Sequence, residues 1–319
     1  MNKPRVTILM TVFNGERYLR EAIQSILDQT YTNFFFLIVD DCSSDRTPKL
    51  LRSYNDERIQ VITNKRNLGV TDSLNIGLTE INTEYIARMD ADDISLPERL
   101  EEQMRIIEGN KNASLVVNSY YLIDESGRET GISAPSIVEP IEDFYCGPSM
   151  FMKKECVQKA GNYRSFFKYS QDYDLYLRLL EEGEVLTIVK PLYKHRRHSS
   201  SISTTKRQEQ RLYYSLAMIM SEQRKRCGKD ILWGKSGKTI DSIREEIFGL
   251  PDKQKKKILS STYATWGHAA CRVGRNLSAL EFAIKSLGLY PCNYRAWLII
   301  LKIIPGIIGY LKEAKAGTS

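Results

Sequence analysis

The chain has 319 residues, an ordinary mixture of hydrophobic and charged residues, and a formal net charge of +7. This length allows one large domain with an appendage, or two domains, and the composition is ordinary for a globular protein. Residues 1–205 carry 25 Lys and Arg against 30 Asp and Glu (−5), whereas residues 206–319 carry 21 against 9 (+12). The basic second region could meet nucleic acid or the anionic cytoplasmic face of a membrane.

The cysteines and the N-terminus favour an intracellular location. Six cysteines are scattered along the chain without a CxxC pair or a zinc-ligand spacing. Free thiols in a reducing compartment are therefore expected. Residues 1–5 contain no apolar signal region, so nothing suggests export.

Strand and helix patterns alternate four times in the first part of the chain. A continuous apolar run at residues 6–10 is typical of a strand buried on both faces, and residues 34–39 are a second apolar strand. A third strand is expected at residues 59–63 and a fourth, buried strand at residues 85–89, with helices between the strands. This alternation predicts an α/β fold, with a Rossmann-like, mostly parallel sheet flanked by helices. No GxGxxG motif follows the first strand, which weighs against a common dinucleotide site.

Side chains that can bind a ligand follow all four predicted strands. In such a sheet, ligands bind at the carboxyl ends of the strands, so these side chains are expected to form one site. They are Thr11, Phe13 and Glu16 after the first strand, Asp41 after the second, Arg66 and Asn67 after the third, and Asp90 and Asp92 after the fourth.

Three carboxylates, Asp90, Asp92 and Asp93, lie within four positions. Like charges this close repel one another unless a cation shares them. Hard oxygen ligands at a rigid strand end suit a divalent metal that holds a diphosphate. The alternative is a loop in which Asp93 or Ser95 caps the helix expected after Pro97.

The remaining pattern changes in character at about residue 206. Before it, we expect a helix that ends at about residue 109, a loop at 130–143 and a helix from about residue 170. We also expect strands at 114–123, 150–152 and 185–189. After it, basic helices without strands are expected, with turns at 228–240 and at Pro251. Within residues 263–291, Gly267, Gly274, Ala279 and Pro291 occur at spacings similar to those of one tetratricopeptide-type helix hairpin.

Two C-terminal stretches have patterns that suggest a function. The first is compatible with membrane contact, and the second does not match a phosphate loop. Residues 296–311 are apolar except for Lys302 and are too short for a confident membrane span. They could lie at a membrane interface or pack on the protein. Residues 234–239 look like a phosphate loop, but Leu232 stands where that motif needs glycine.

Several of these stretches together resemble family 2 of the inverting glycosyltransferases, which have the nucleotide-sugar-binding A-type fold. The resemblance spans residues 5–205, so residues 1–205 are expected to be the catalytic domain and residues 206–319 a basic helical region outside it. The stretches that carry it are residues 6–14, 37–45, 67–69, 90–93, 171–175 and 198–203, in fitting order and spacing.

The resemblance implies roles for the strand-end residues. Asp41 would accept a hydrogen bond from the uracil N3–H, and Asp92 and His198 would bind Mn²⁺ or Mg²⁺, which neutralises the leaving diphosphate. Asp93 is then expected to cap the following helix. The nucleotide-sugar would contact Thr11, Phe13, Glu16, Asp41, Arg66, Asn67, Asp90, Ala91 and Asp92.

Asp172 matches the general base of the family. It would deprotonate the acceptor hydroxyl, and its pKa is expected to lie well below neutral. A helix cap is the alternative role, and Asp174 is the competing base. The chain departs from the family at Gln171, where Glu is usual, and at Cys42, where Gly is frequent and where we expect a small buried thiol.

The implied function is transfer of a sugar from a UDP-hexose or UDP-N-acetylhexosamine to a hydroxyl of a glycan or lipid-linked acceptor. Surface polysaccharide synthesis in the cytoplasm, with peripheral contact of the C-terminal region to the cell membrane and no nucleic-acid partner, fits this expectation. A non-catalytic nucleotide-sugar-binding or scaffold protein is the main alternative. A nucleotidyltransferase is disfavoured, because residues 11–16 contain a single glycine.

Overall fold

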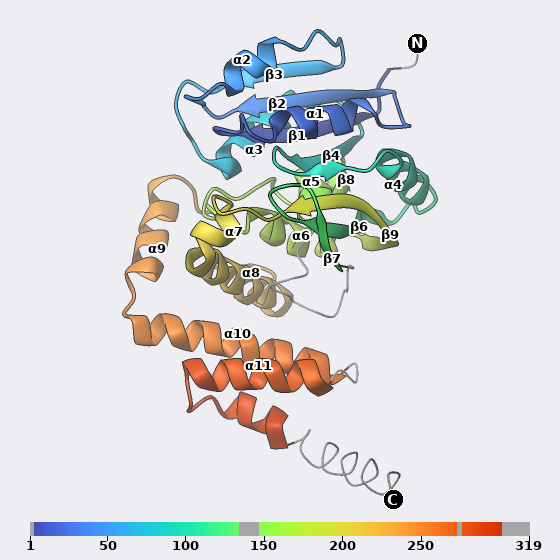
Figure 1. Ribbon diagram of the computed structural model, residues 1–319. Coiled ribbons are helices and arrows are strands. Elements are labelled where there is room, and N and C mark those ends of the chain that lie inside the picture. Colours follow the sequence, from blue (N-terminus) through green and yellow to red (C-terminus); the bar gives the residue numbers. More distant parts are fainter. Residues whose placement is uncertain (1–2, 134–146, 273–275, 302–319) are drawn as a thin grey trace, which may run out of the picture. The chain divides into compact units, whose positions relative to one another are not determined.

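The computed structural model describes residues 3–133, 147–272 and 276–301 (Figure 1). The described residues up to Ala217 form one compact unit, and those from Met218 onward form a second. The domain boundary expected at residue 205 stays a prediction. Each unit is described in turn.

A mixed sheet of nine described strands forms the framework of the first unit. Its first part is parallel, in the order β3 (Ile59–Thr63), β2 (Phe34–Asp40), β1 (Val6–Val12) and β4 (Tyr85–Asp90). The four predicted strands and their parallel pairing are therefore confirmed. The chain steps outward from β1 to β3 and then returns to the other side of β1, and sheets of this class bind ligands at such a reversal.

The second part of the sheet mixes directions. The short strand β8 (Phe151–Lys153) lies antiparallel between β4 and β6 (Ala113–Ile123). Strand β9 (Glu184–Arg196) runs parallel to β6, while β5 (Ile94–Ser95) and β7 (Glu129–Ser133) pair antiparallel with β9 and β6. Strand β7 falls in a region where the sequence indicated a loop from residue 130.

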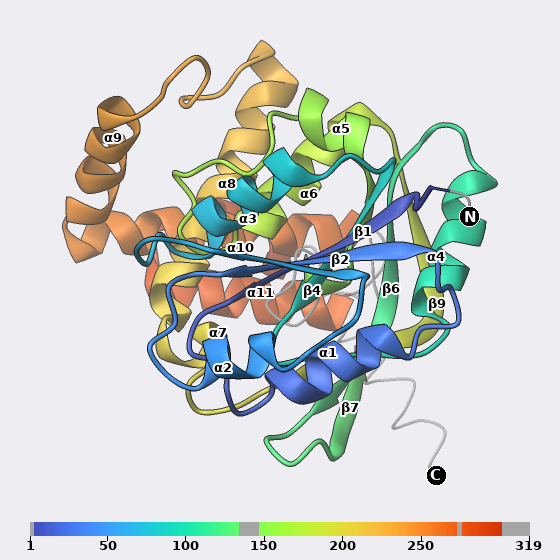
Figure 2. The ribbon, with the colours of Figure 1, turned by 90° about the horizontal axis from the view of Figure 1, so that it is seen from above.

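Helices cover both faces of the sheet, so β1 is apolar on both sides (Figure 2). Ile8 and Met10 pack in one core, and Leu9 packs in the other. This explains the apolar runs of β1 and β2. One face carries α1 (Leu19–Leu27), α2 (Thr47–Arg52) and α4 (Arg99–Glu108), and the other carries α3 (Val70–Glu80), α5 (Lys154–Lys159) and α6 (Gln171–Glu182).

Strand β9 is longer than the predicted strand at 185–189. It continues through Pro191, where its ladder with β6 shifts register opposite Ser119. A proline is tolerated in a strand at such an irregularity. Beyond Pro191 the strand pairs with β6 as far as Arg196, and residues 193–194 also pair with β5.

The described residues from 206 onward contain helices and no strand, as predicted. Helix α8 begins in the first unit and ends in the second. Helices α10 and α11 pair as a hairpin. A Cβ at Gly267 of α10 would lie only 3.2 Å from the carbonyl oxygen of Ala279 in α11, so the close approach favours glycine there. The helices are α8 (Arg207–Cys227), α9 (Lys238–Gly249), α10 (Asp252–Arg272), α11 (Asn276–Leu289) and the helical residues 294–301.

The apolar stretch 296–311 is only partly described. Ala296 and Ile299 are buried in the core of the α10–α11 hairpin, whereas Trp297 and Leu301 are exposed. Residues 302–311 lie outside the described residues, so both interpretations of this stretch stay open. None of the described helices is both long and apolar enough to cross a membrane.

Candidate active site

The strand register brings the predicted strand-end residues to one edge of the sheet. Thr11 pairs with Asp90 across β1 and β4, and Asp40 pairs with Val12 across β2 and β1. The N–H of Asp41 then donates to the carbonyl oxygen of Val12 at 2.8 Å. The residues predicted at these three strand ends therefore lie beside one another.

The loop after β1 is fixed against the loop after β2. Asn14 Oδ1 accepts a hydrogen bond from Ser44 N at 2.8 Å, and Glu16 Oε2 accepts one from Arg46 N at 2.9 Å. The carboxylate of Glu16 thus holds the neighbouring loop. Phe13 follows β1 with half of its side chain exposed, so its ring can contact a base or ribose.

Asp41 is buried and holds the turn between β3 and α3. Its Oδ1 accepts hydrogen bonds from Asn64 Nδ2 and Leu68 N, and its Oδ2 accepts one from Gly69 N, each at 2.8 Å. The predicted contact with uracil stays a prediction. The sequence analysis did not predict Asn64 as a residue of the site. Its position directly after β3 could have indicated this role.

The same turn places Arg66 and Asn67 on the surface, where both are exposed. Their predicted contacts with base or phosphate stay predictions. Ala91 lies on the loop after β4, where its Cβ would be 4.0 Å from a Cβ at Gly15. The loops after β1 and β4 thus approach closely, which supports a shared site.

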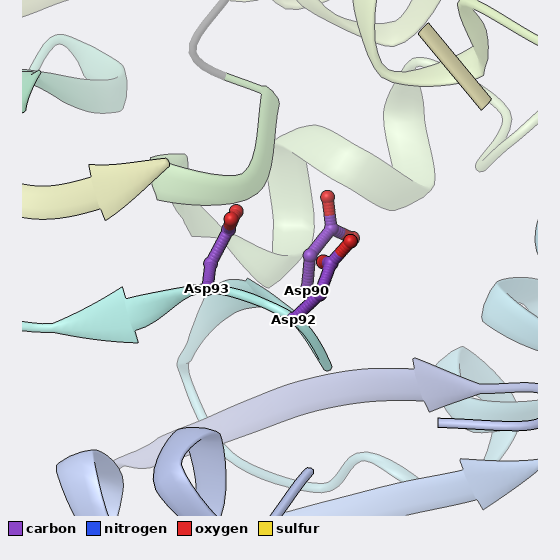
Figure 3. A group of neighbouring side chains, drawn as sticks. All are labelled: Asp90, Asp92 and Asp93. Carbon is purple, nitrogen blue, oxygen red and sulfur yellow. The ribbon is translucent and has the colours of Figure 1, made fainter. Parts of the chain in front are cut away.

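Asp92 of the aspartate cluster after β4 and His198 form a pair of side chains that could hold a metal ion. One carboxylate oxygen from each of Asp90, Asp92 and Asp93 lies within 4.8 Å of the others (Figure 3). Asp92 Oδ2 is 2.8 Å from His198 Nε2, and Ser200 Oγ is 2.9 Å from His198 Nδ1. Two ligands that are ~2.1 Å from an octahedral ion lie about 3 Å apart, so Asp92 and His198 fit one shared ion.

Asp93 has a different role from its predicted one. It is buried, its Oδ1 accepts a hydrogen bond from Arg196 N at 2.7 Å, and its Oδ2 is 3.2 Å from His195 Nδ1. Helix α4 begins at Arg99, with Glu98 at the cap position and no side-chain cap. The cap assignment of Asp93 was therefore wrong, because this carboxylate pins the end of β9 to the loop after β4.

His195 and Arg196 complete this attachment. Burial opposes the imidazolium, but Asp93 raises the pKa of His195 to about 9, so the pair is ionic at neutral pH. Arg196 donates from Nε to Asp92 O at 2.8 Å and from Nη2 to Glu21 Oε2 at 2.5 Å. The sequence analysis missed Arg196, although it stands in the basic run before His198.

A buried arginine links the aspartate cluster to the predicted base. Arg88 lies in β4, two residues before Asp90, and is 1% exposed. Its Nη2 donates to Asp90 Oδ1 at 2.6 Å, and its Nε is 3.6 Å from Asp172 Oδ1. The sequence analysis missed Arg88, although a charge within an apolar strand signals a buried partner.

Asp172 lies in the first turn of α6 and is almost fully buried. Gln171 Nε2 donates to its Oδ2 at 3.2 Å, and its Oδ1 accepts no hydrogen bond from the described residues. Burial raises the pKa of Asp172 to about 6, although Arg88 opposes this shift. The expectation of a pKa well below neutral was wrong, and so was the cap alternative, because Ser170 holds the cap position.

Asp174, the competing candidate, is fully occupied by two arginines. It is buried, Arg164 donates to both of its oxygens, and Arg178 Nη2 donates to Oδ2 at 2.7 Å. Although burial opposes the charged form, Arg178 and Arg164 lower the pKa of Asp174 below its usual value. Asp174 therefore anchors α6, whereas Asp172 keeps one oxygen available.

The start of α6 rests on the first half of α8. Ser170 Oγ donates to Gln210 O at 3.0 Å, and the ring of Tyr214 stacks on Tyr173 with 3.7 Å between centroids. Tyr213 contacts the rings of three further aromatic residues, which are Phe166, Phe167 and Tyr169. These contacts fix the helix that carries Asp172.

Cys42 is exposed rather than buried, which contradicts the sequence-based expectation. Its backbone has φ = 66°, in the left-handed region that favours glycine. This conformation explains why glycine suits the position.

We expect Cys42→Gly to raise the free energy of unfolding by about 0.5–1 kcal/mol, because it removes the Cβ from a left-handed residue. Chemical denaturation followed by circular dichroism measures this gain. Cys42→Ala is the matched control, since it removes the thiol and keeps the Cβ. An equal gain in both variants would assign the effect to the thiol.

The pKa of Asp172 predicts the pH dependence of turnover. A base must be deprotonated, so kcat should rise with pH through about 6 and level off above it. In Gln171→Glu a like charge replaces the donated hydrogen bond, so the acidic limb should move up by about one pH unit. The kcat–pH profiles of both proteins test this. If the acidic limb of the Gln171→Glu profile did not move, the contact between residue 171 and Asp172 would not influence the pKa of the base.

A parallel half-sheet with a carboxylate–histidine cluster at its carboxyl edge and a buried carboxylate nearby is the arrangement of an A-type glycosyltransferase. The family model described as "Glycosyl transferase family 2" matches residues 7–172. The chain belongs to this family of glycosyltransferases.

Its relatives include two proteins of similar length. The chain is 34% identical over 208 residues to EpsE of Bacillus subtilis, a provisionally assigned glycosyltransferase, covering 62% of this chain and 75% of EpsE. It is 32% identical over 248 residues to an uncharacterized glycosyltransferase of Methanocaldococcus jannaschii, covering 73% of this chain and 85% of that protein.

Solved structures with low sequence identity share the fold. Residues 1–349 of S. aureus TarS in complex with UDP-GlcNAc give a TM-score of 0.59 at 14% identity, covering 90% of this chain and 89% of that one. The mannosyltransferase PcManGT of Pyrobaculum calidifontis, in complex with GDP-Man and Mn²⁺, gives 0.53 at 17% identity, covering 98% and 88%. The predicted α/β fold with flanking helices is confirmed.

Proposed function

We propose that this chain is a metal-dependent, inverting glycosyltransferase that uses a UDP-hexose or UDP-N-acetylhexosamine. The acceptor is a hydroxyl of a glycan or lipid-linked sugar, in surface polysaccharide synthesis at the cytoplasmic face of the membrane. The observation that carries this proposal is the buried Arg88, which contacts both Asp90 of the metal motif and Asp172. One side chain thus sets the distance between the donor side and the acceptor side.

On the donor side, Asp92 and His198 would hold Mn²⁺ or Mg²⁺, with Asp90 beside them. The ion, when bound, neutralises the leaving nucleoside diphosphate. Phe13 and Thr11 would contact the nucleoside, while Asp41 holds the turn that presents Arg66 and Asn67. The complexes of TarS with UDP-GlcNAc and of PcManGT with GDP-Man and Mn²⁺ support a nucleotide-sugar and a divalent ion here.

On the acceptor side, Asp172 Oδ1 is the atom that would take the proton from the acceptor hydroxyl. The acceptor oxygen forms its bond to the anomeric carbon as the bond to the diphosphate oxygen breaks, on the opposite face of the sugar. The configuration at the anomeric carbon is therefore inverted. Arg88 and Gln171 hold the carboxylate, and its pKa of about 6 keeps it ionised at neutral pH.

The proposal is tested by a thermal-shift screen of UDP- and GDP-sugars, each with and without Mn²⁺. A true donor raises the melting temperature by mass action, and the rise should require the ion. Slow hydrolysis of the same sugar without acceptor distinguishes the enzyme from a nucleotide-sugar-binding scaffold. Binding without any hydrolysis or transfer would favour the scaffold.

A further inference from the structure

The loop between α8 and α9, residues 228–237, has a fixed shape. Gly228 ends α8 in the left-handed conformation, and its N–H donates to Arg224 O at 2.8 Å. Asp230 is buried and accepts hydrogen bonds from Arg224 Nη1 at 2.5 Å and from Leu232 N at 2.9 Å. This buried ion pair joins the loop to α8 and so holds the loop in one conformation.

This conformation turns two large apolar side chains outward. Leu232 is buried, whereas its neighbours Ile231 and Trp233 are 48% and 66% exposed. Trp233 N donates to Asp230 O at 3.0 Å, so the turn itself sets the direction of the tryptophan. Two exposed apolar side chains on one ordered loop favour a partner that removes them from water.

The exposed charges around these side chains are mostly positive. The acidic residues between positions 222 and 237 are Glu222, which forms an ion pair with Arg226 at 2.8 Å, and Asp230, whose carboxylate is buried. Lys225, Lys229 and Lys235 are exposed in the same range. The range includes part of the segment that looked like a phosphate loop in the sequence, and Lys235 of that segment lies on this surface.

We propose that the loop of residues 228–237 docks on an anionic lipid bilayer, with Ile231 and Trp233 entering the interface and the surrounding lysines contacting headgroups. Tryptophan favours the boundary between hydrocarbon and water, and each nearby cation strengthens binding to anionic lipid. A second copy of the chain fits less well, because two such loops would bring like charges together. The inference deepens the proposed function and rests on it for the lipid-linked acceptor.

The experiment is vesicle flotation of the full chain with phosphatidylcholine alone and with about one quarter phosphatidylglycerol. We expect binding to the anionic vesicles that weakens with salt. Ile231→Ser with Trp233→Ser should lower the partition coefficient at least about tenfold. Each Lys→Gln change at Lys225, Lys229 or Lys235 should lower it about fivefold.

Ile284→Ser is the matched control, since Ile284 is 58% exposed on α11 and lies outside the loop. Unchanged vesicle binding in the loop variant, or equal loss in Ile284→Ser, would overturn the proposal. Loss in Trp297→Ser alone would place the contact on the C-terminal helix. A change of oligomeric mass in the loop variant, or equal Trp233-dependent binding to single-stranded oligonucleotide, would identify another partner.

Hydrolysis of the nucleotide-sugar in solution is measured on the same samples. The loop variant should keep the parent rate, because the loop is not part of the catalytic site. Vesicle binding without hydrolysis in the parent would refute the proposed function and leave the docking loop standing. Hydrolysis with no vesicle binding would support the proposed function and refute the docking loop.

Discussion

Asp172→Asn is expected to lower kcat by about 10²–10⁴ while leaving the dissociation constant of the donor unchanged. The change keeps the shape of the side chain and removes its ability to accept the proton. Single-turnover transfer and calorimetric titration with donor and Mn²⁺ measure the two quantities. Full activity in this variant would refute the assignment of Asp172 as the base.

Asp174→Asn, two residues further along α6, should give the opposite pattern. Arg164 and Arg178 would lose a buried ionic partner, so we expect the free energy of unfolding to fall by about 3–5 kcal/mol. Turnover per folded molecule should stay close to that of the parent. A large loss of kcat in folded Asp174→Asn, with normal kcat in Asp172→Asn, would exchange the two roles.

Asp92→Ala is expected to abolish the metal-dependent part of UDP binding. The carboxylate is one of two groups whose spacing fits a shared ion, and a diphosphate binds poorly without that charge. Isothermal titration of UDP with and without Mn²⁺ measures the difference. An unchanged titration in the presence of Mn²⁺ would refute Asp92 as a ligand.

Two histidines close to the end of β9 provide the matched control. His198→Ala should weaken Mn²⁺-dependent UDP binding at least about tenfold, because His198 contacts Asp92. His195→Ala should leave that dependence in place, because His195 contacts Asp93, which pins β9. An equal loss of Mn²⁺-dependent UDP binding in both variants would mean that His198 is not a metal ligand and that both histidines only stabilise the structure at the end of β9.

The sequence predicted the parallel part of the fold well, because its signals are local. A strand buried on both faces is predominantly apolar, and such runs are visible at β1 and β2. The carboxyl ends of parallel strands meet at one edge, so the order of strands along the chain is enough to group Asp41 with Asp90.

The errors concern contacts between residues distant in the chain. The role of Asp93 depends on β9, about a hundred positions later, and β9 continues past Pro191 because both β6 and β5 pair with it there. The pKa of Asp172 depends on how deeply the first turn of α6 is buried, which residue spacing does not reveal. Arg88 was a visible signal, but its two carboxylate partners belong to different elements.

The contacts of α8 bear on how this enzyme could be recombined with its relatives. Gln210 and Tyr214 contact the start of the helix that carries the proposed base, and Tyr213 contacts the segment just before it. All three residues follow the predicted catalytic domain in sequence. A chimera that joined a foreign C-terminal region at residue 205 would replace this support. The unit to exchange between family members therefore includes residues 207–217.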